Sequence, residues 1–447
     1  MLIQTGNFAS KKSRLQGEEL QQSRLKTELQ IDVLQKWGLT AIGLGSRDLT
    51  LGVEWWGNYL QRHQEVPLVS TNLQCPEILT PPKYIVDQNS GVGILSVFPE
   101  KFSIENCKTM PVLNSMADAI EEAERERNKE GLQKIQRWIV MGELTTTDQL
   151  QIGQNLTQVD LYFDAKNLSP KEDVSTNVSD WAVFSSGTRG KHVGVVYWSF
   201  EDNSNLRISG QRERYLVDLE HNKKTLATAQ ETLKKIQGEE PKDQIKISRA
   251  KNRLSFYENR IKELNTKLSK KDEGLGDVLS FKLMALSREI SDHKEVQNMV
   301  EETKGDIALL KSENPPTYEG AYVGSSKCQS CHSKQYESWQ QTPHAHAYQT
   351  LKNVNRNLDY DCYTCHVTGA FDKEGPAHPK QFEGVLENVG CESCHGAGQE
   401  HVSTGKNIKI PAPSKEGCLD CHDGIRDEGR FEFNRYMELV RNACIRN

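Results

Sequence analysis

The feature that most constrains this chain is a five-residue pattern, Cys-x-x-Cys-His, which occurs four times in its last quarter. The copies occupy residues 328–332, 362–366, 391–395 and 418–422. Positions i, i+3 and i+4 share one face of a helical turn. Both thiols of a copy can therefore form thioethers with one haem, while the histidine supplies an axial nitrogen to its iron. Four successive copies predict four covalently bound c-type haems, with zinc knuckles or redox dithiols as the alternative.

This pattern defines sixteen candidate site residues. The predicted haem-attaching thiols are Cys328, Cys331, Cys362, Cys365, Cys391, Cys394, Cys418 and Cys421. The predicted iron ligands are the motif histidines His332, His366, His395 and His422, and the four other histidines after residue 317, which are His344, His346, His378 and His401. Eight histidines would fill both axial positions of four haems, and such ligation favours electron transfer because no iron position stays open. Alternatively, one or two of the four histidines outside the motifs are ordinary surface histidines.

Composition sets the broad class of the protein. The length of 447 residues suggests about two to four domains, and the net charge of −6 gives no reason to expect a nucleic-acid partner. No apolar run is long enough to predict a transmembrane helix. The first residues lack the basic and apolar segments of a signal peptide. Because c-type haem is attached outside the cytoplasm, we interpret Met1 as an internal or truncated start and expect a periplasmic or extracytoplasmic location.

Three cysteines lie outside the motifs, namely Cys75, Cys107 and Cys444. Cys75 and Cys107 could form a disulfide in an oxidising compartment. Two buried free thiols are the equally simple alternative. The sequence leaves this choice open.

Residues 1–205 show strands alternating with helices, which predicts an α/β layered domain. The expected helices cover 15–37, 53–63 and 115–131. The expected strands cover 40–45, 66–70, 90–98, 138–141, 159–163, 181–184 and 193–198.

Residues 206–275 differ in kind, because apolar residues recur there at intervals of seven. Leu219, Leu226 and Leu233 form one such series, and Ile247, Leu254, Ile261 and Leu268 form the second. A break near residues 238–241 favours a helical coiled-coil hairpin over a dimerising coiled coil, which would make a homo-oligomer. Between Lys242 and Lys271 there are ten Lys and Arg against three Asp and Glu. That charge suits either a solvated helix face or a docking arm for an acidic partner.

The remaining boundaries follow from these patterns. Residues 276–314 resume a helical pattern and are expected to form closing helices and a linker that ends at Pro315 and Pro316. Residues 315–447 are expected to form a tetrahaem module made mostly of helices and loops. The motifs are separated by only 29, 24 and 22 residues, so each spacer can do little more than wrap one haem, and the haems should lie close together.

The order of elements in residues 1–205 resembles the metallophosphoesterase domain of the 5′-nucleotidase family. The stretch 2–7 resembles that family's strand ending in Gly-Asp, and 185–194 resembles its glycine-rich turn. The family uses Asp, Asn and His side chains to hold two metal ions. Other residues stand at those places here, namely Asn7, Ser46, Arg47, Glu143, Lys166 and Leu168. The resemblance therefore implies a phosphoesterase-like scaffold with a degenerate metal site.

The stretch from Ala321 onward resembles the tetrahaem cytochromes that accept electrons from hydroxylamine oxidoreductase in nitrifiers, and their multihaem relatives. The matching segments are 322–332, 336–348, 365–369 and 389–402. The resemblance implies that His344 and His401 are distal ligands to haems other than the nearest one. His346 is the alternative to His344, and His378 is the remaining candidate.

These patterns predict electron transfer through four c-type haems, with redox proteins as partners and the rest of the chain as a non-catalytic docking scaffold. One alternative is a redox enzyme that acts on a small nitrogen or sulfur compound at one open haem. A second alternative is a 5′-nucleotidase-type hydrolase fused to a cytochrome.

Overall fold

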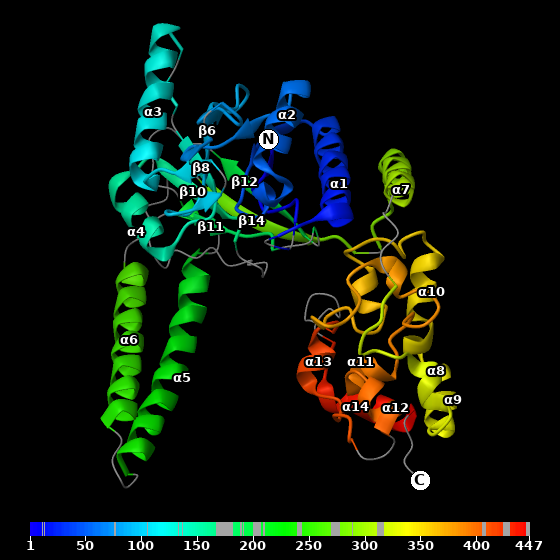
Figure 1. Cartoon of the computed structure of the whole chain (residues 1–447). Coiled ribbons are helices and arrows are strands. Elements are labelled where there is room, and N and C mark those ends of the chain that lie inside the picture. The colour runs from blue at the N-terminus through cyan, green and yellow to red at the C-terminus, as the bar shows by residue number, and fades with distance from the viewer. Residues whose placement is uncertain are drawn as a thin grey trace. The chain divides into compact units, whose positions relative to one another are not determined.

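The computed structural model describes residues 1–166, 182–199, 207–208, 211–238, 244–269, 278–310, 317–404, 408–422 and 430–443, apart from residues 11, 13, 76, 105, 133, 136, 188, 189, 191 and 288. The chain forms two compact units (Figure 1). The first comprises Met1–Phe8, Leu39–Leu49 and Gly57–Ile290. The second comprises Ala9–Gly38, Thr50–Trp56 and Ser291–Asn447. An N-terminal segment therefore belongs to the same unit as the four motifs.

A five-stranded sheet in the order β11-β10-β9-β6-β5 lies at the centre of the first unit. Its strands are β5 (Tyr84–Val86), β6 (Val92–Val97), β9 (Arg137–Gly142), β10 (Val159–Asp164) and β11 (Ala182–Phe184). The strands β6, β9, β10 and β11 run parallel, and β5 is an antiparallel edge. Every residue of β6 is buried, as expected for a parallel strand covered on both faces.

Side chains on the two faces of this sheet form two separate cores. Leu95, Val140 and Tyr162 pack on one face with the helices α3 (Val112–Lys129) and α4 (Thr146–Asn155). Ile94 and Met141 face the opposite core. Neighbouring residues of a strand point to opposite faces. Successive apolar residues of one strand therefore contribute in turn to the two cores. The predicted α/β layered domain is confirmed.

Three smaller sheets complete the first unit. The strands β1 (Leu2–Gln4), β2 (Leu39–Gly43) and β3 (Leu68–Val69) pair in parallel. An antiparallel sheet has the order β4-β8-β7, with β4 (Leu73–Gln74), β7 (Ser103–Ile104) and β8 (Cys107–Thr109). Cys75 and Cys107 form a disulfide beside it. The third sheet has the order β12-β14-β13, with β12 (His192–Ser199), β13 (Arg207–Ile208) and β14 (Val278–Ala285).

The expectation of helices throughout 276–314 was wrong for its first part, because residues 278–285 form strand β14. Leu279 and Phe281 point into the core, while Met284 is exposed. This alternation has the period of two that marks a strand. The helix of this stretch, α7, is shorter and covers Lys294–Leu309. Pro315 and Pro316 lie outside the described residues.

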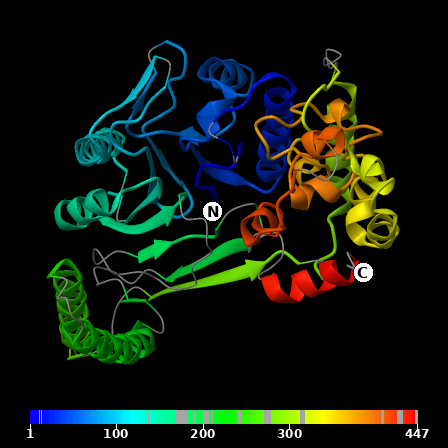
Figure 2. The same ribbon diagram turned by 60° about the horizontal axis from the view of Figure 1, so that its bottom comes forward.

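The predicted hairpin is confirmed as two long helices, α5 (Gln211–Gly238) and α6 (Gln244–Ser269). They lie side by side in both views (Figures 1 and 2). Leu219, Ala229 and Ile247 are buried, and Leu264 has no exposed surface. The two helices contact each other, so they form a helical hairpin within the chain.

The second unit is built mostly of short helices and loops, as predicted. It contains α1 (Gly17–Lys36), α7, α8 (Ser325–Gln329), α9 (Ser333–Gln340), α10 (Ala347–Lys352), α11 (Cys391–His395), α12 (Gln399–Thr404), α13 (Lys415–Leu419) and α14 (Phe433–Ala443). Its core is a small cluster that includes Tyr348, Tyr363 and Phe382. Helix α2 covers Val53–Arg62, and short 3-10 helices cover Asp48–Leu51, Pro343–His346, Tyr363–Cys365 and Pro379–Gln381. Across the part of the chain that the structure describes, no helix has the length and apolar character needed to span a bilayer.

Candidate haem centre

Three of the four motifs lie on a short α-helical turn. His332 N donates to Cys328 O at 2.9 Å, and His422 N donates to Cys418 O at 2.8 Å. The third motif forms helix α11 itself. The second motif is a 3-10 turn, in which His366 N donates to Tyr363 O at 2.7 Å. In the α-helical copies, the first cysteine and the histidine thus lie one hydrogen-bonded turn apart.

Two pairs of histidine rings that are distant in sequence lie close to each other. The ring centroids of His332 and His401 are 6.3 Å apart, and those of His344 and His422 are 6.2 Å apart. Metal–imidazole bonds of about 2 Å on both sides of one iron would separate the two centroids by roughly 6 Å. The two pairs therefore fit bis-histidine haem iron, one at the first motif and one at the fourth.

Hydrogen bonds at Nδ1 orient three of the candidate ligands. The Nδ1 of His401 donates to Ile408 O at 2.6 Å, that of His366 to Ala347 O at 2.7 Å, and that of His395 to Pro411 O at 2.8 Å. A carbonyl oxygen can only accept, so the proton is on Nδ1 in each ring. The Nε2 lone pair is left for a metal, as is usual for ligating histidines.

His346 and His378 are placed differently. His346 is exposed, and its Nε2 donates to Gln340 O at 3.0 Å. The Nδ1 of His378 accepts from Lys380 N at 3.2 Å, and its Nε2 donates to Glu18 Oε2 at 3.2 Å. Both ring nitrogens of His378 are therefore engaged. Within the described residues, no second histidine ring lies close to His366 or His395 as in the two pairs.

The first and third motifs adjoin each other. The thiols of Cys328 and Cys391 are in hydrogen-bonding contact, which raises the pKa of Cys328 and lowers that of Cys391 because one thiol donates to the other. Ser325 Oγ accepts from Cys391 N at 3.0 Å. The haem-attachment points of two motifs more than 60 residues apart are thus neighbours, which agrees with closely spaced haems.

Glu392 lies inside the third motif and connects it by hydrogen bonds to the chain just before the first motif. This residue was not identified from the sequence. Its side chain is buried, and its carboxylate accepts from Val323 N at 3.0 Å, Gly324 N at 2.7 Å and Gly398 N at 2.7 Å. Buried carboxylates are stable only when hydrogen-bonded in this way. An acidic residue between two attaching cysteines carries no recognisable sequence signal for this role.

Aromatic side chains surround the fourth motif. The ring of His422 stacks on Phe431 at 5.6 Å and meets Tyr436 edge-on at 5.0 Å. Burial, followed by the proximity of His422, lowers the pKa of His344, which favours the neutral imidazole that a metal requires. The apolar spacing within α14 could have indicated this packing from the sequence.

The second motif follows a buried acidic residue. Asp359 is almost fully buried, and its carbonyl oxygen accepts from Cys362 N at 2.9 Å and Tyr363 N at 3.0 Å. Burial, and then the negative charge of Asp359, raises the pKa of Cys362 to about 11. The negative charge of Asp359 therefore acts on Cys362, the first cysteine of this motif.

The residues at the phosphoesterase-like positions form a hydrogen-bonded network in the first unit. The Asp48 carboxylate accepts from Asn7 N at 2.6 Å and Gly45 N at 2.8 Å. The Glu143 carboxylate accepts from Ser46 N at 2.6 Å and Asn7 Nδ2 at 3.0 Å. Both carboxylates therefore accept hydrogen bonds from backbone amides or from the side chain of Asn7. Among the residues described, no group of three or more His, Cys, Asp and Glu side chains could hold a metal ion.

Asn7 is the hub of this network. Its backbone has a φ of 57°, which is accessible to asparagine. Its Oδ1 accepts from Arg47 N at 2.9 Å, and its Nδ2 also donates to Ala165 O at 3.2 Å. Lys166 continues this loop, with its amide donating to Asp164 at 2.8 Å. Leu168 lies outside the described residues.

Comparison with known proteins supports the haem interpretation. Residues 327–396 match the family model for cytochrome c554 and c-prime. The chain is 38% identical over 138 residues to cytochrome c-554 of Nitrosomonas europaea, a match that covers 23% of this chain and 58% of that protein. It is 39% identical over 70 residues to the C-type polyheme cytochrome OmcB of Geobacter sulfurreducens, covering 15% of this chain and 9% of that protein. The chain thus spans less than two thirds of either relative.

Among solved structures, the chain is similar to a 5′-nucleotidase precursor from Thermus thermophilus. That similarity has a TM-score of 0.33 and 17% identity, and it covers 44% of this chain and 42% of the other. The sequence matches concern the motif region. The C-terminal part of this chain therefore resembles the cytochrome c554 family, and its relatives support covalently bound c-type haem and a multihaem electron-transfer role.

Proposed function

We propose that the chain transfers electrons through four covalently bound c-type haems, one at each Cys-x-x-Cys-His motif. The observation that carries the proposal is the spacing of the pairs His332–His401 and His344–His422, at 6.3 and 6.2 Å. Haem supplies a carrier for single electrons, whose potential depends on axial ligands, burial and hydrogen bonding. An iron with two histidine ligands has no position left for a substrate, which suits a carrier.

Each motif residue then has a specific role. The eight motif cysteines attach the haems, and His332, His366, His395 and His422 are the proximal ligands. His401 completes the first haem and His344 the fourth. The Nδ1 hydrogen bonds of His366, His395 and His401 hold the rings in the tautomer that offers Nε2 to iron.

The rest of the chain acts as a non-catalytic docking scaffold in this proposal. The hydrogen bonds that occupy Asp48 and Glu143 support a role without hydrolysis. We propose a periplasmic or extracytoplasmic location, in line with c-type haem and the Cys75–Cys107 disulfide. Redox proteins would be its partners, and the coiled-coil hairpin could mediate a homo-oligomer.

A second candidate function is catalysis at one open haem, acting on a small nitrogen or sulfur compound. It is favoured by the engagement of both ring nitrogens of His378, by Lys380 N and Glu18. His378 would then not serve as a distal ligand, and one haem would keep an open position. A high-spin ferric signal in the electron paramagnetic resonance (EPR) spectrum of the untreated protein would support this candidate over a pure carrier.

The decisive test removes one distal ligand at a time. In His401→Ala, the first haem should change from low-spin to high-spin, because its iron loses one of two nitrogens. The matched control is His346→Ala, which removes an exposed histidine outside both pairs and should leave the spectrum unchanged. Haem content, measured as the pyridine haemochrome, should be four per chain. Stoichiometric zinc without haem would overturn the proposal.

A further inference from the structure

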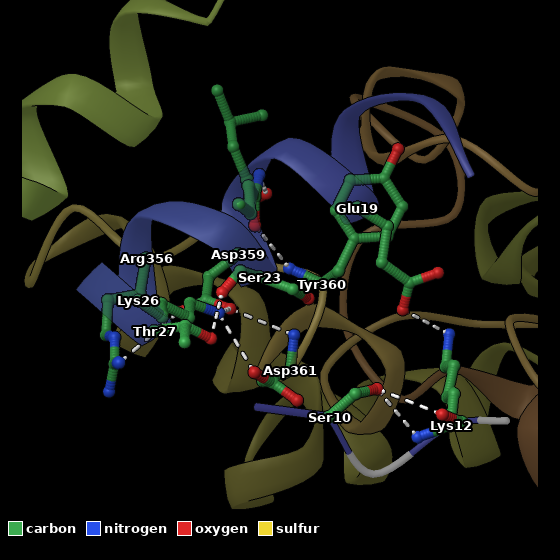
Figure 3. A network of polar contacts seen from close by, with 12 residues as sticks. Ser10, Lys12, Glu19, Ser23, Lys26, Thr27, Arg356, Asp359, Tyr360 and Asp361 are labelled. Carbon is green, nitrogen blue, oxygen red and sulfur yellow. Dashed lines mark hydrogen bonds and ion pairs between the residues drawn. The ribbon is translucent and has the colours of Figure 1, made fainter. Parts of the chain in front are cut away.

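Helix α1 presents one polar face to residues on both sides of the second motif. Glu18, Gln22 and Lys26 are spaced by four residues, so they lie on the same face of the helix. All three contact the region between Leu358 and His378. Figure 3 shows Lys26 reaching Asp359 and Asp361 from this helix.

Gln22 binds the backbone on both sides of Asp359. Its Nε2 donates to Leu358 O at 2.8 Å, and its Oε1 accepts from Tyr360 N at 3.2 Å. The side chain is buried, with 2% of its surface exposed. This two-point contact fixes the position of the segment along the helix without using charge.

Lys26 adds a positive charge to this contact between helix α1 and the segment around Asp359. Its Nζ lies 2.5 Å from Asp359 Oδ1 and 2.9 Å from Asp361 Oδ2, and the Asp359 side chain is only 5% exposed. Burial acts to lower the pKa of Lys26, but the two carboxylates outweigh it and raise that pKa, so the lysine is a cation at neutral pH. Arg356 Nη2 lies 3.3 Å from Asp359 Oδ2. A buried carboxylate of this kind is stable only while its cations are present.

The lysine therefore lies close to a haem-attachment turn. The backbone oxygen of Asp359 receives the amides of Cys362 and Tyr363, which begin the turn of the second motif. Replacing Lys26 by a neutral residue therefore removes the positive charge that faces the carboxylate of Asp359, the residue that starts this turn. Nearby charge, burial and hydrogen bonds are what set a haem potential.

We propose that Lys26 is a positioning residue that sets the reduction potential of the second haem, and that helix α1 is part of the electron-transfer module. This inference rests on the proposed function, because it requires a haem at residues 362–366. Lys26 balances the carboxylates of Asp359 and Asp361. Without it, net negative charge beside the haem would stabilise ferric over ferrous iron and lower the potential.

The test is Lys26→Met in the full chain, followed by potentiometric titration of the haem spectrum. One haem should become harder to reduce by about tenfold in its equilibrium constant, which is about 59 mV for one electron. The other haems should keep their potentials. Lys26→Arg, which restores the positive charge, should return the shifted haem towards its original value.

Two further variants separate charge from folding. Asp361→Asn removes a half-exposed negative charge while leaving the Lys26–Asp359 pair in place, so it should raise the same potential. Lys36→Met is the matched control, because Lys36 lies on the same helix and pairs with Glu295, with side chains 47% and 58% exposed. That variant should shift no haem.

The outcomes distinguish this inference from the proposed function. If Lys26→Met and Asp361→Asn both leave every potential unchanged in protein with full haem content, Lys26 has no such role. Too few haems in the unsubstituted protein would contradict the proposed function instead. If Lys26→Met fails to retain the second haem, the shift in Asp361→Asn decides the question, and its absence overturns the inference.

Discussion

At the scale of single residues, Glu392 shows how much the haem region depends on a few buried polar groups. Three backbone amides, from two separate loops, donate to one buried carboxylate. The apolar core of this region is small. A hydrogen-bonded carboxylate can therefore carry part of the organisation that apolar packing provides in larger domains.

Glu392→Ala should lower the stability of the second unit by about 3 kcal/mol, because it leaves buried amides without an acceptor. For a unit of this size, the melting temperature should fall by roughly 6–12 °C. Differential scanning calorimetry measures this shift. The control is Glu400→Ala, which removes an exposed carboxylate on α12 and should leave the melting temperature within error. Equal melting temperatures for both variants would contradict the role given to Glu392.

The attachment cysteines give a second prediction at this scale. Under the proposal of one haem per motif, Cys421→Ala should leave three haems with two thioethers and a fourth held by one. The fourth haem should become partly extractable by acid–acetone, while the other three stay attached. Mass spectrometry of the intact protein counts the covalent haems. Loss of all four haems would argue against independent sites.

At the scale of elements, the α5–α6 hairpin is a separate arm of the first unit. Leu219, Ala229, Ile247 and Leu264 are buried in it, whereas Leu216 and Phe256 are exposed on its surface. The surplus of Lys and Arg between residues 242 and 271 gives that surface a positive charge. Complementary charge mainly speeds association and makes it dependent on salt.

Replacing residues 211–272 by a short linker should leave the haem spectrum unchanged, because all the proposed haem ligands lie in the second unit. Electron exchange with an acidic redox partner should slow, and its dependence on ionic strength should flatten. Stopped-flow spectroscopy at several salt concentrations measures both. The same rates, salt dependence and oligomeric state after deletion would mean that the basic run is only a solvated face.

At the scale of the whole molecule, the two units differ in the chemistry that their polar residues can perform. In the first unit, Asp48 and Glu143 are held by backbone amides and Asn7. In the second unit, the rings of His332 and His401 lie 6.3 Å apart, and the Nδ1 of His401 donates to Ile408 O. The residues proposed to hold the haems are thus concentrated in one unit of the chain.

The full chain should therefore show no hydrolysis of nucleotides when manganese or zinc is added. Two-metal hydrolysis requires ligands free to bind both ions, and the carboxylates here already accept hydrogen bonds from the protein. Phosphate release is the measurement, with isothermal calorimetry as a separate reading of metal binding. Turnover that Asp48→Ala abolishes would show that the network opens to form an active site.

The sequence alone determined what depends on local pattern. Four repeated motifs indicated the cofactor, alternating apolar residues indicated the layered α/β domain, and spacing by seven indicated the hairpin. Each of these signals is contained within a short stretch, where the period of apolar or reactive side chains reflects the local backbone geometry. The disulfide, by contrast, required Cys75 and Cys107 to be brought together.

Only the tertiary structure decided which distant residues meet. It brought His332 close to His401 and His344 close to His422. It also placed both ring nitrogens of His378 in hydrogen bonds, with Glu18 and with the amide of Lys380. It also placed helix α1 in the haem unit, where Lys26 meets Asp359 across more than 300 residues of chain. Such contacts arise from long-range packing, and the periodicity of a single segment carries no information about its partner.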